Sequence, residues 1–129
     1  MPLIKWRDSY SVGVEQFDQE HAQLVDIINE LYVIIRDKQA VTALDSAMDR
    51  LIEYTRRHFM AEEDAMEQVG YPFLDEHKEI HLDLERQVLD FQKQVKAEKE
   101  VQSDFYVFLR DWLIHHIIEE DKKYSSYMA

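Results

Sequence analysis

Four apolar stripes at helical spacing constrain the fold of this chain more than any other feature of its sequence. In each stripe, large apolar residues recur every three or four positions, which places them on one face of a helix. Glycine and proline, two of each in 129 residues, are too few for a turn-rich β fold. The sequence therefore predicts an all-α fold, an up-down-up-down antiparallel four-helix bundle, with helices at about residues 18–38, 42–69, 72–98 and 103–121.

Residues at the ends of the stripes indicate where the helices begin and end. Asp18 and Ser103 are preferred N-cap residues for the first and fourth helices. Gly70 ends the second stripe, and Pro72 is typical of a new helix start. These signals predict short loops, which make consecutive helices antiparallel neighbours.

The rest of the chain is too short for a second domain, so we interpret residues 1–129 as a single domain. Residues 1–17 carry Trp6 and Tyr10 among polar residues. We expect them to form an N-terminal arm whose aromatic rings pack against the bundle. The tail, residues 122–129, is predicted to fray or pack loosely.

Charge and cysteine content exclude several classes of function. The formal net charge of −12, from 27 acidic against 15 basic residues, disfavours a nucleic acid partner because no basic surplus neutralises phosphates. No cysteine is present, so disulfides, thiolate zinc sites and iron–sulfur clusters are excluded. No apolar run approaches the roughly 20 residues of a membrane span, and the start lacks a secretory signal, so we expect a cytoplasmic protein. A metal site here must consist of His, Asp and Glu, which favours iron, manganese or zinc.

Polar residues interrupt two of the stripes at core positions. His58 and Glu62 are spaced i, i+4 in the second stripe, and His77 and His81 have the same spacing in the third. This spacing places each pair on one helix face. A buried carboxylate is destabilising unless it is paired or binds a metal, so the two pairs predict four metal ligands on facing helices. Glu63 lies off this face, and we expect it to be solvated.

Two more histidines lie at the matching ends of the other helices. His21 heads the first stripe, and His116 lies near the end of the fourth. In an alternating bundle, the starts of odd-numbered helices and the ends of even-numbered helices lie at the same pole. A lone core histidine is ordinarily a packing residue, but five in one layer beside buried carboxylates predict a metal site. Five imidazoles and two carboxylates are too many for one ion and suit a bridged pair.

Spacing alone does not identify the acidic partner of His116. Glu119 at i+3 and Glu120 at i+4 share a helix face with His116, whereas Asp121 at i+5 lies about 140° around an ideal α-helix. Asp121 would join the cluster only if the helix loosens or ends there. His115 is about 100° from His116 and is predicted to be a flanking or surface residue.

The combined motifs resemble the hemerythrin family. The chain has H-x3-E at residues 58–62, H-x3-H at 77–81, H-x4-D at 116–121 and an upstream D-x2-H at 18–21. Nearly the whole chain is similar to that family, above all to its small single-domain bacterial form. The resemblance implies a non-haem di-iron centre, with two iron ions (Fe2+/Fe3+) and a bridging oxo or hydroxo group, that binds oxygen reversibly for transport, storage or delivery.

The resemblance also implies a role for each ligand position. One iron would be bound by His77, His81 and His116, and the other by His21 and His58. The two irons would be bridged by Glu62 and Asp121. The resemblance thus selects Asp121 over Glu120. It further implies that O2 binds end-on, as a hydroperoxide, to the iron that has two histidines.

Reversible binding needs a dry pocket, because a dry pocket withholds the protons and water that release peroxide. Five apolar residues are candidates to line such a pocket, although core packing explains each of them equally well: Leu24, Phe59, Trp112, Leu113 and Ile117.

A rival hypothesis is a di-iron enzyme, such as an oxidase, a peroxidase or a nitric-oxide scavenger, and another is an oxygen or redox sensor. Ferritin-like oxidases use carboxylate-rich sites with Glu-x-x-His pairs, and no histidine here has Glu three residues before it. No appended signalling domain supports the sensor. We therefore expect an oxygen-binding protein that is not an enzyme and has no catalytic residues, a monomer that delivers oxygen to an unidentified protein.

Overall fold

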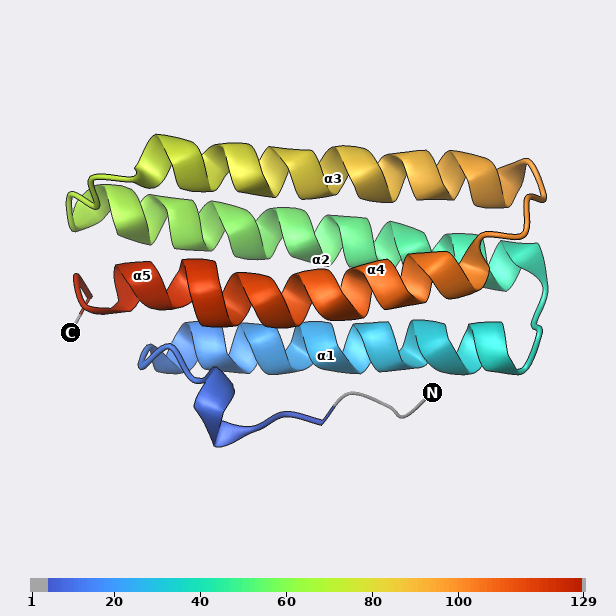
Figure 1. Ribbon diagram of the computed structural model, residues 1–129, viewed down its shortest axis with the longest axis horizontal. Coiled ribbons are helices and arrows are strands. Elements are labelled where there is room, and N and C mark those ends of the chain that lie inside the picture. The colour runs from blue at the N-terminus through green and yellow to red at the C-terminus, as the bar shows by residue number, and fades with distance from the viewer. Residues whose placement is uncertain (1–4, 129) are drawn as a thin grey trace.

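The computed structural model describes residues 5–128, and residues 1–4 of the predicted arm and residue 129 of the tail lie outside this part. The four long helices run antiparallel and side by side (Figure 1), and residues 5–128 contain no β-strand. The predicted all-α four-helix bundle is therefore confirmed. Its helical segments after the arm are α1 (Glu15–Arg36), α2 (Val41–Gln68), α3 (Leu74–Lys96), α4 (Gln102–His115), the π-helix η2 (His116–Asp121) and α5 (Lys122–Ser125).

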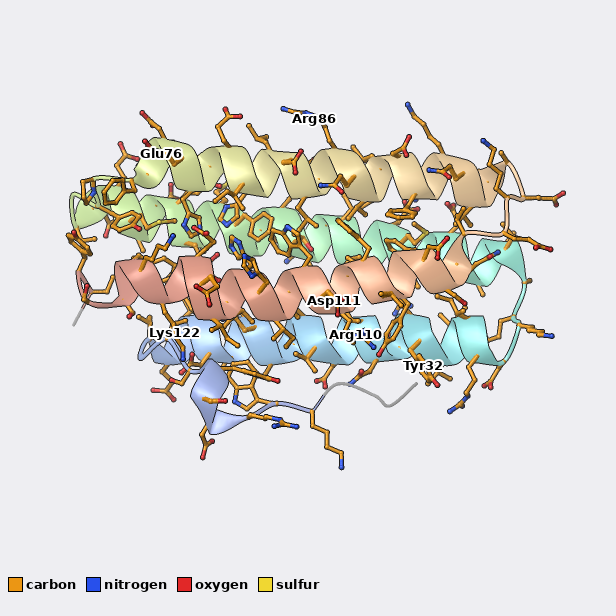
Figure 2. The ribbon with its side chains drawn as sticks, in the orientation of Figure 1. Tyr32, Glu76, Arg86, Arg110, Asp111 and Lys122 are labelled. Carbon is orange, nitrogen blue, oxygen red and sulfur yellow. The ribbon has the colours of Figure 1, made fainter. Side chains whose placement is uncertain are left out.

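Apolar side chains fill the space between the helices. α1 packs against α2 and α4, and α3 also packs against α2 and α4, so the helices enclose one core. Leu31 of α1 and Phe105 of α4 are fully buried there. Polar side chains cover the outside, and Glu76 and Arg86 point away from the outer side of α3 (Figure 2). In this described part, no helix is both long and apolar enough to cross a bilayer.

The loops between the long helices begin with the same backbone turn. Gly70 follows α2 with a φ of 71°, and the Tyr71 N–H donates to the Met66 carbonyl at 2.9 Å. This bond closes a Schellman motif, in which a residue with positive φ ends the helix. Lys38 after α1 and Glu98 after α3 take the same position with φ values of 51° and 59°. The turns keep the loops short, so consecutive helices lie antiparallel.

The prediction that Asp18 caps the first helix is wrong. α1 begins three residues earlier, at Glu15, and its N-cap residue is Val14. The Asp18 carboxylate accepts hydrogen bonds from the Ser11 hydroxyl at 2.5 Å and from the Val12 N–H at 2.8 Å. Asp18 therefore fastens the preceding chain to the first turn of α1 instead of starting the helix.

The predicted starts of two other helices also differ from the structure. Ser103 lies inside α4, whose N-cap residue is Val101. The third helix begins at Leu74, two residues after Pro72, with Phe73 as its N-cap residue. These differences are small because the apolar periodicity locates the middle of a helix better than its ends.

The described part of the arm lies against the bundle. Its single 3-10 turn, η1, spans Asp8–Tyr10, and the Trp6 and Tyr10 rings contact each other edge to face at 5.6 Å while packing on the core. The Lys122 ammonium donates to the Ser9 carbonyl at 2.5 Å. The arm therefore joins the start of α1 to the end of the fourth helix, at one pole of the bundle.

The prediction of a loosely packed tail is wrong for residues 122–125. Lys122–Ser125 form the helix α5, and Tyr124 is fully buried. The Tyr127 ring contacts the Tyr71 ring at 5.1 Å between centroids. The tail continues the fourth helix and closes the same pole that the arm covers (Figure 1).

Candidate metal centre

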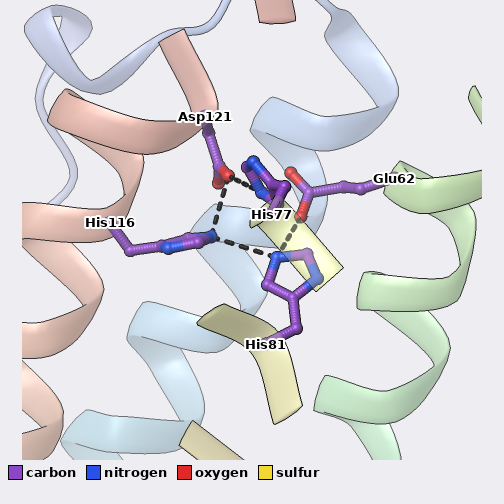
Figure 3. Close-up of side chains that lie close together, drawn as sticks. All are labelled: Glu62, His77, His81, His116 and Asp121. Carbon is purple, nitrogen blue, oxygen red and sulfur yellow. Dashed lines mark hydrogen bonds and ion pairs between the residues drawn. The ribbon is translucent and has the colours of Figure 1, made fainter. Parts of the chain in front are cut away.

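One layer of buried polar side chains interrupts the core at the pole closed by the arm and α5. Every residue in this layer is at most 3 % exposed. α1, α2, α3 and η2 each contribute at least one of them, and Figure 3 shows five. They are the seven ligand candidates of the sequence, His21, His58, Glu62, His77, His81, His116 and Asp121.

A change of helix type brings Asp121 into the layer. His116–Asp121 form a π-helix, in which residues five apart lie above each other because each backbone hydrogen bond spans five residues. The Asp121 carboxylate consequently lies 2.9 Å from His116 Nε2 (Figure 3). Glu120 points instead toward Lys123, at 3.3 Å, and His115 is exposed.

The seven side chains form two groups that share both carboxylates. One group holds Glu62, His77, His81, His116 and Asp121, and the other holds His21, His58, Glu62 and Asp121. Within each group the potential ligand atoms lie within 4.8 Å of one another. The donors are imidazole nitrogens and carboxylate oxygens, a set that suits first-row transition metals such as iron and zinc.

Asp121 presents one oxygen to each group. Its Oδ1 lies 3.0 Å from His77 Nε2, and its Oδ2 lies 3.0 Å from His21 Nε2. Glu62 reaches both groups as well, with Oε2 at 3.3 Å from His21 Nε2 and Oε1 at 3.7 Å from His81 Nε2. The arrangement can therefore hold two metal ions side by side, with a carboxylate on each side of the pair.

Buried polar atoms that make no hydrogen bond support metal binding in this layer. Among the described residues, the buried side-chain nitrogens and oxygens without a hydrogen-bond partner all belong to the candidate ligands, and they include Nε2 of His21, His58 and His77 and both Asp121 oxygens. Leaving such atoms unpaired in a dry core is costly. Bound cations would satisfy them, so the residues fit a metal site.

The protein's own charges keep the two carboxylates ionised. Burial and Asp121 raise the pKa of Glu62, but His58 and His21 outweigh both effects and lower that pKa to about 2. Burial also raises the pKa of Asp121, yet His116, His21 and His77 hold it well below its usual range. Anionic carboxylates are the form that binds metal ions.

The electrostatic environment shifts the pKa values of His58 and His81 in opposite directions. Burial lowers the pKa of His58, but Glu62 and Glu20 outweigh burial and raise it to about 10. In His81, burial prevails over the carboxylate of Glu63, and its pKa is lowered. Metals bind the neutral imidazole, so metal binding at His58 would release a proton.

Two carboxylates outside the layer orient ligand candidates, and the sequence interpretation missed both. Glu20 Oε1 lies 2.5 Å from His58 Nδ1, and Glu63 Oε2 lies 2.7 Å from His81 Nδ1. An Nδ1–H that donates to a carboxylate leaves Nε2 facing the site and makes it more basic. The prediction that Glu63 is merely solvated is wrong, because a single α-helix face does not reveal a partner on the neighbouring helix.

A third group that the sequence interpretation missed is Tyr124 of α5. Its buried hydroxyl donates a hydrogen bond to Glu62 Oε2, and its ring contacts Phe17 and His77 at 5.9 and 5.8 Å between centroids. Burial and the neighbouring Glu62 raise the pKa of Tyr124, so it stays protonated and remains a donor. The sequence indicated a role for Tyr124 only by placing it three residues after the ligand candidate Asp121.

Four of the five pocket candidates line one apolar cavity of about 30 Å³ beside the layer: Leu24, Phe59, Trp112 and Leu113. Ile117 is fully buried but is not part of that lining. The Phe59 ring stacks on the His81 ring at 3.6 Å, and the Trp112 ring stacks on the His116 ring at 4.3 Å. Aromatic rings therefore cover two of the imidazoles on the cavity side.

Known proteins are similar to this chain in sequence and in fold. The family described as Hemerythrin HHE cation binding domain matches residues 12–127. A bacteriohemerythrin of Methylococcus capsulatus is 34% identical over 134 residues, covering 100% of this chain and 99% of the relative. A myohemerythrin of Theromyzon tessulatum is 30% identical and covers 95% and 91% of the two chains.

Solved structures agree with these sequence relatives. A wild-type hemerythrin crystal structure superposes with a TM-score of 0.90 at 32% identity, covering 98% of both chains. The match extends over the whole bundle, including the pole that holds the histidines. Fold, residue pattern and sequence similarity lead to one conclusion, that this chain belongs to the hemerythrin family.

Proposed function

We propose that the protein binds oxygen reversibly, as a carrier or a store, at two iron ions. The observation that carries this proposal is that Glu62 and Asp121 belong to both groups of ligand atoms, as carboxylates that bridge two ions must. Bound iron would supply the electrons that oxygen takes up on binding and returns on release. The proposed ligands are His77, His81 and His116 on one side, His21 and His58 on the other, and Glu62 and Asp121 between them.

The other residues of the site would hold these ligands in place. Glu20 and Glu63 fix the rings of His58 and His81 through their Nδ1 atoms, and Tyr124 fixes Glu62. The side with two histidines offers fewer protein donors, so we assign oxygen binding to that side. Ligands held by such partners need little reorganisation when the oxidation state of the metal changes.

The surroundings of the site would protect bound oxygen from water. Phe59 and Trp112 cover two imidazoles of the layer and line the apolar cavity together with Leu113, and the arm and α5 close the opposite end. A water molecule is stable inside a protein only where two to four polar partners hold it. The apolar wall would therefore withhold the protons that convert bound oxygen into released peroxide.

A spectroscopic experiment tests reversibility directly. The iron-loaded protein is reduced without air, exposed to oxygen and then flushed with argon, while visible absorption is recorded and iron per chain is measured. We expect two irons per chain and a charge-transfer band that appears with oxygen and disappears on flushing. Prompt and irreversible conversion to the oxidised form would refute the carrier and favour a di-iron enzyme or a sensor.

The oligomeric state is part of the same proposal. We propose that the chain acts as a monomer, because both groups of ligand atoms are complete within one chain. Sedimentation of the iron-loaded protein should give the mass of one chain, 15.6 kDa plus its iron. A stable dimer would contradict the proposal.

A further inference from the structure

The apolar cavity of about 30 Å³ ends beside the proposed metal site, separated from it by two aromatic rings. Phe59 and Trp112 form that end, with their ring faces on His81 and His116. A molecule in the cavity is therefore one aromatic ring away from two proposed ligands of the three-histidine side. The lining also includes Leu24, one turn of α1 beyond His21, so the cavity adjoins the two-histidine side, to which oxygen binding is assigned. Apolar walls favour a small apolar gas over water or ions, because a buried polar molecule needs hydrogen-bond partners.

The other end of the cavity reaches the surface between α2 and α3. Thr55 and Arg56 from α2 and Glu85 from α3 line this end. Arg56 Nε donates to Glu85 Oε1 at 2.5 Å, and the two side chains are 57% and 28% exposed. A charged pair thus spans the opening between two helices whose other lining residues, apart from Thr55, are apolar.

Arg56 separates the cavity from the outside. Besides the cavity, Arg56 lines one surface groove with Met60 and Leu82 and a second groove with Asp49 and Leu89. The Arg56 side chain is the wall that these three spaces share. Moving it would connect the cavity to both grooves.

An exposed ion pair has the properties of a fast gate. Such pairs are weak because water screens the charges and the long side chains lose rotamer freedom, and exposed side chains change rotamer within picoseconds to nanoseconds. The pair between Arg56 and Glu85 can therefore open without movement of a helix. When it is closed, it covers the apolar interior.

We propose that this cavity is the route by which small apolar gases reach the metal centre, and that the Arg56–Glu85 ion pair is its gate. The inference rests on the proposed function, since oxygen is the gas that the centre would bind. A gate changes the barrier between solvent and site but not the energies of the free and bound states. It therefore sets the rates of entry and exit and leaves affinity unchanged.

Oxygen kinetics test the gate. In stopped-flow measurements on the reduced iron-loaded protein, Arg56→Ala should raise the association and dissociation rate constants by the same factor, up to about fivefold, the closed-to-open ratio that an exposed ion pair supports. The matched control is Arg50→Ala, because Arg50 is also an exposed α2 arginine in an ion pair, with Glu30 at 2.7 Å, and lies outside the cavity lining. Wild-type rates in Arg56→Ala, or a change in affinity alone, would overturn the gate.

Xenon tests the route without using iron chemistry. Crystals of the iron-loaded protein under xenon pressure should show xenon in the cavity, and Leu84→Phe should exclude xenon and slow oxygen binding because the added ring fills the space. Val88→Phe, which fills the same cavity from the next turn of α3, serves if Leu84→Phe does not fold. An empty cavity in the wild type, or wild-type oxygen rates with the cavity filled, would overturn the route. A protein that holds xenon but does not bind oxygen would refute the proposed function and still support the cavity as a gas site.

Discussion

Replacing Tyr124 by Phe removes one hydroxyl from the most buried part of the site. In the structure, that hydroxyl donates to Glu62 Oε2, and both residues are fully buried. A hydrogen bond to a charged group contributes about 1.5–3 kcal/mol. No solvent reaches Glu62 to replace the lost donor, so we expect the variant to lose stability of this size.

The change in melting temperature follows from the size of the chain. Unfolding entropy of about 2.1 cal/mol/K per residue over 129 residues gives about 0.27 kcal/mol/K. The loss of 1.5–3 kcal/mol therefore lowers the melting temperature by about 6–11 °C. Far-UV circular dichroism, on samples of measured and equal iron content, records this shift.

The matched control is Tyr127→Phe. Tyr127 lies three residues further along the tail, is 45% exposed and packs its ring against Tyr71, so its exposed hydroxyl should contribute within about 0.5 kcal/mol. Tyr124→Phe should also lose iron faster to a chelator, since partners of metal ligands change metal affinity by about 10–100-fold. Equal melting temperatures for the two variants would refute the role of Tyr124.

Three further substitutions test the ligand set and the pocket. His77→Ala should release iron and lower the melting temperature, because bound metal stabilises the folded state, whereas exposed His115→Ala should change neither; full iron retention in His77→Ala would exclude it as a ligand. Asp121→Asn should weaken iron binding while Glu120→Gln retains it, as measured by iron per chain after dialysis; the reverse order would identify Glu120 as the ligand. Leu113→Asn should speed autoxidation of the oxygenated protein, followed by the decay of its visible absorption, because a polar side chain admits water; an unchanged rate would remove Leu113 from the pocket.

Local periodicity was sufficient to predict most of the fold. An apolar residue every three or four positions specifies a helix with one buried face, and short loops specify antiparallel neighbours. The boundaries were less accurate. Asp18 has the chemistry of a helix cap, but its carboxylate binds Ser11 and Val12 of the arm. The preference of Asp for N-cap positions cannot distinguish a capping role from this contact with the arm, because in both the carboxylate accepts a hydrogen bond from a backbone N–H near a helix start.

Helix polarity also predicted that the histidines would meet. His58 and Glu62 share a face because a regular α-helix returns to the same side after four residues. Asp121 required more than this rule. Ideal α-helical geometry directs Asp121 away from His116, and the π-helix directs it back, to 2.9 Å. The family resemblance selected Asp121, and the structure supplies the physical reason.

The sequence by itself determined the elements, their directions and the layer in which the histidines and Glu62 lie, because these follow from interactions within a few residues. The tertiary structure alone decided which groups support that layer. Glu20 is 38 residues from His58, and Tyr124 is 62 residues from Glu62, so no local pattern records either contact. The same holds for the cavity and the ion pair across its mouth, which exist only where side chains of different helices meet. Spacing along one helix determines which residues face inward, but packing between helices determines what they contact there.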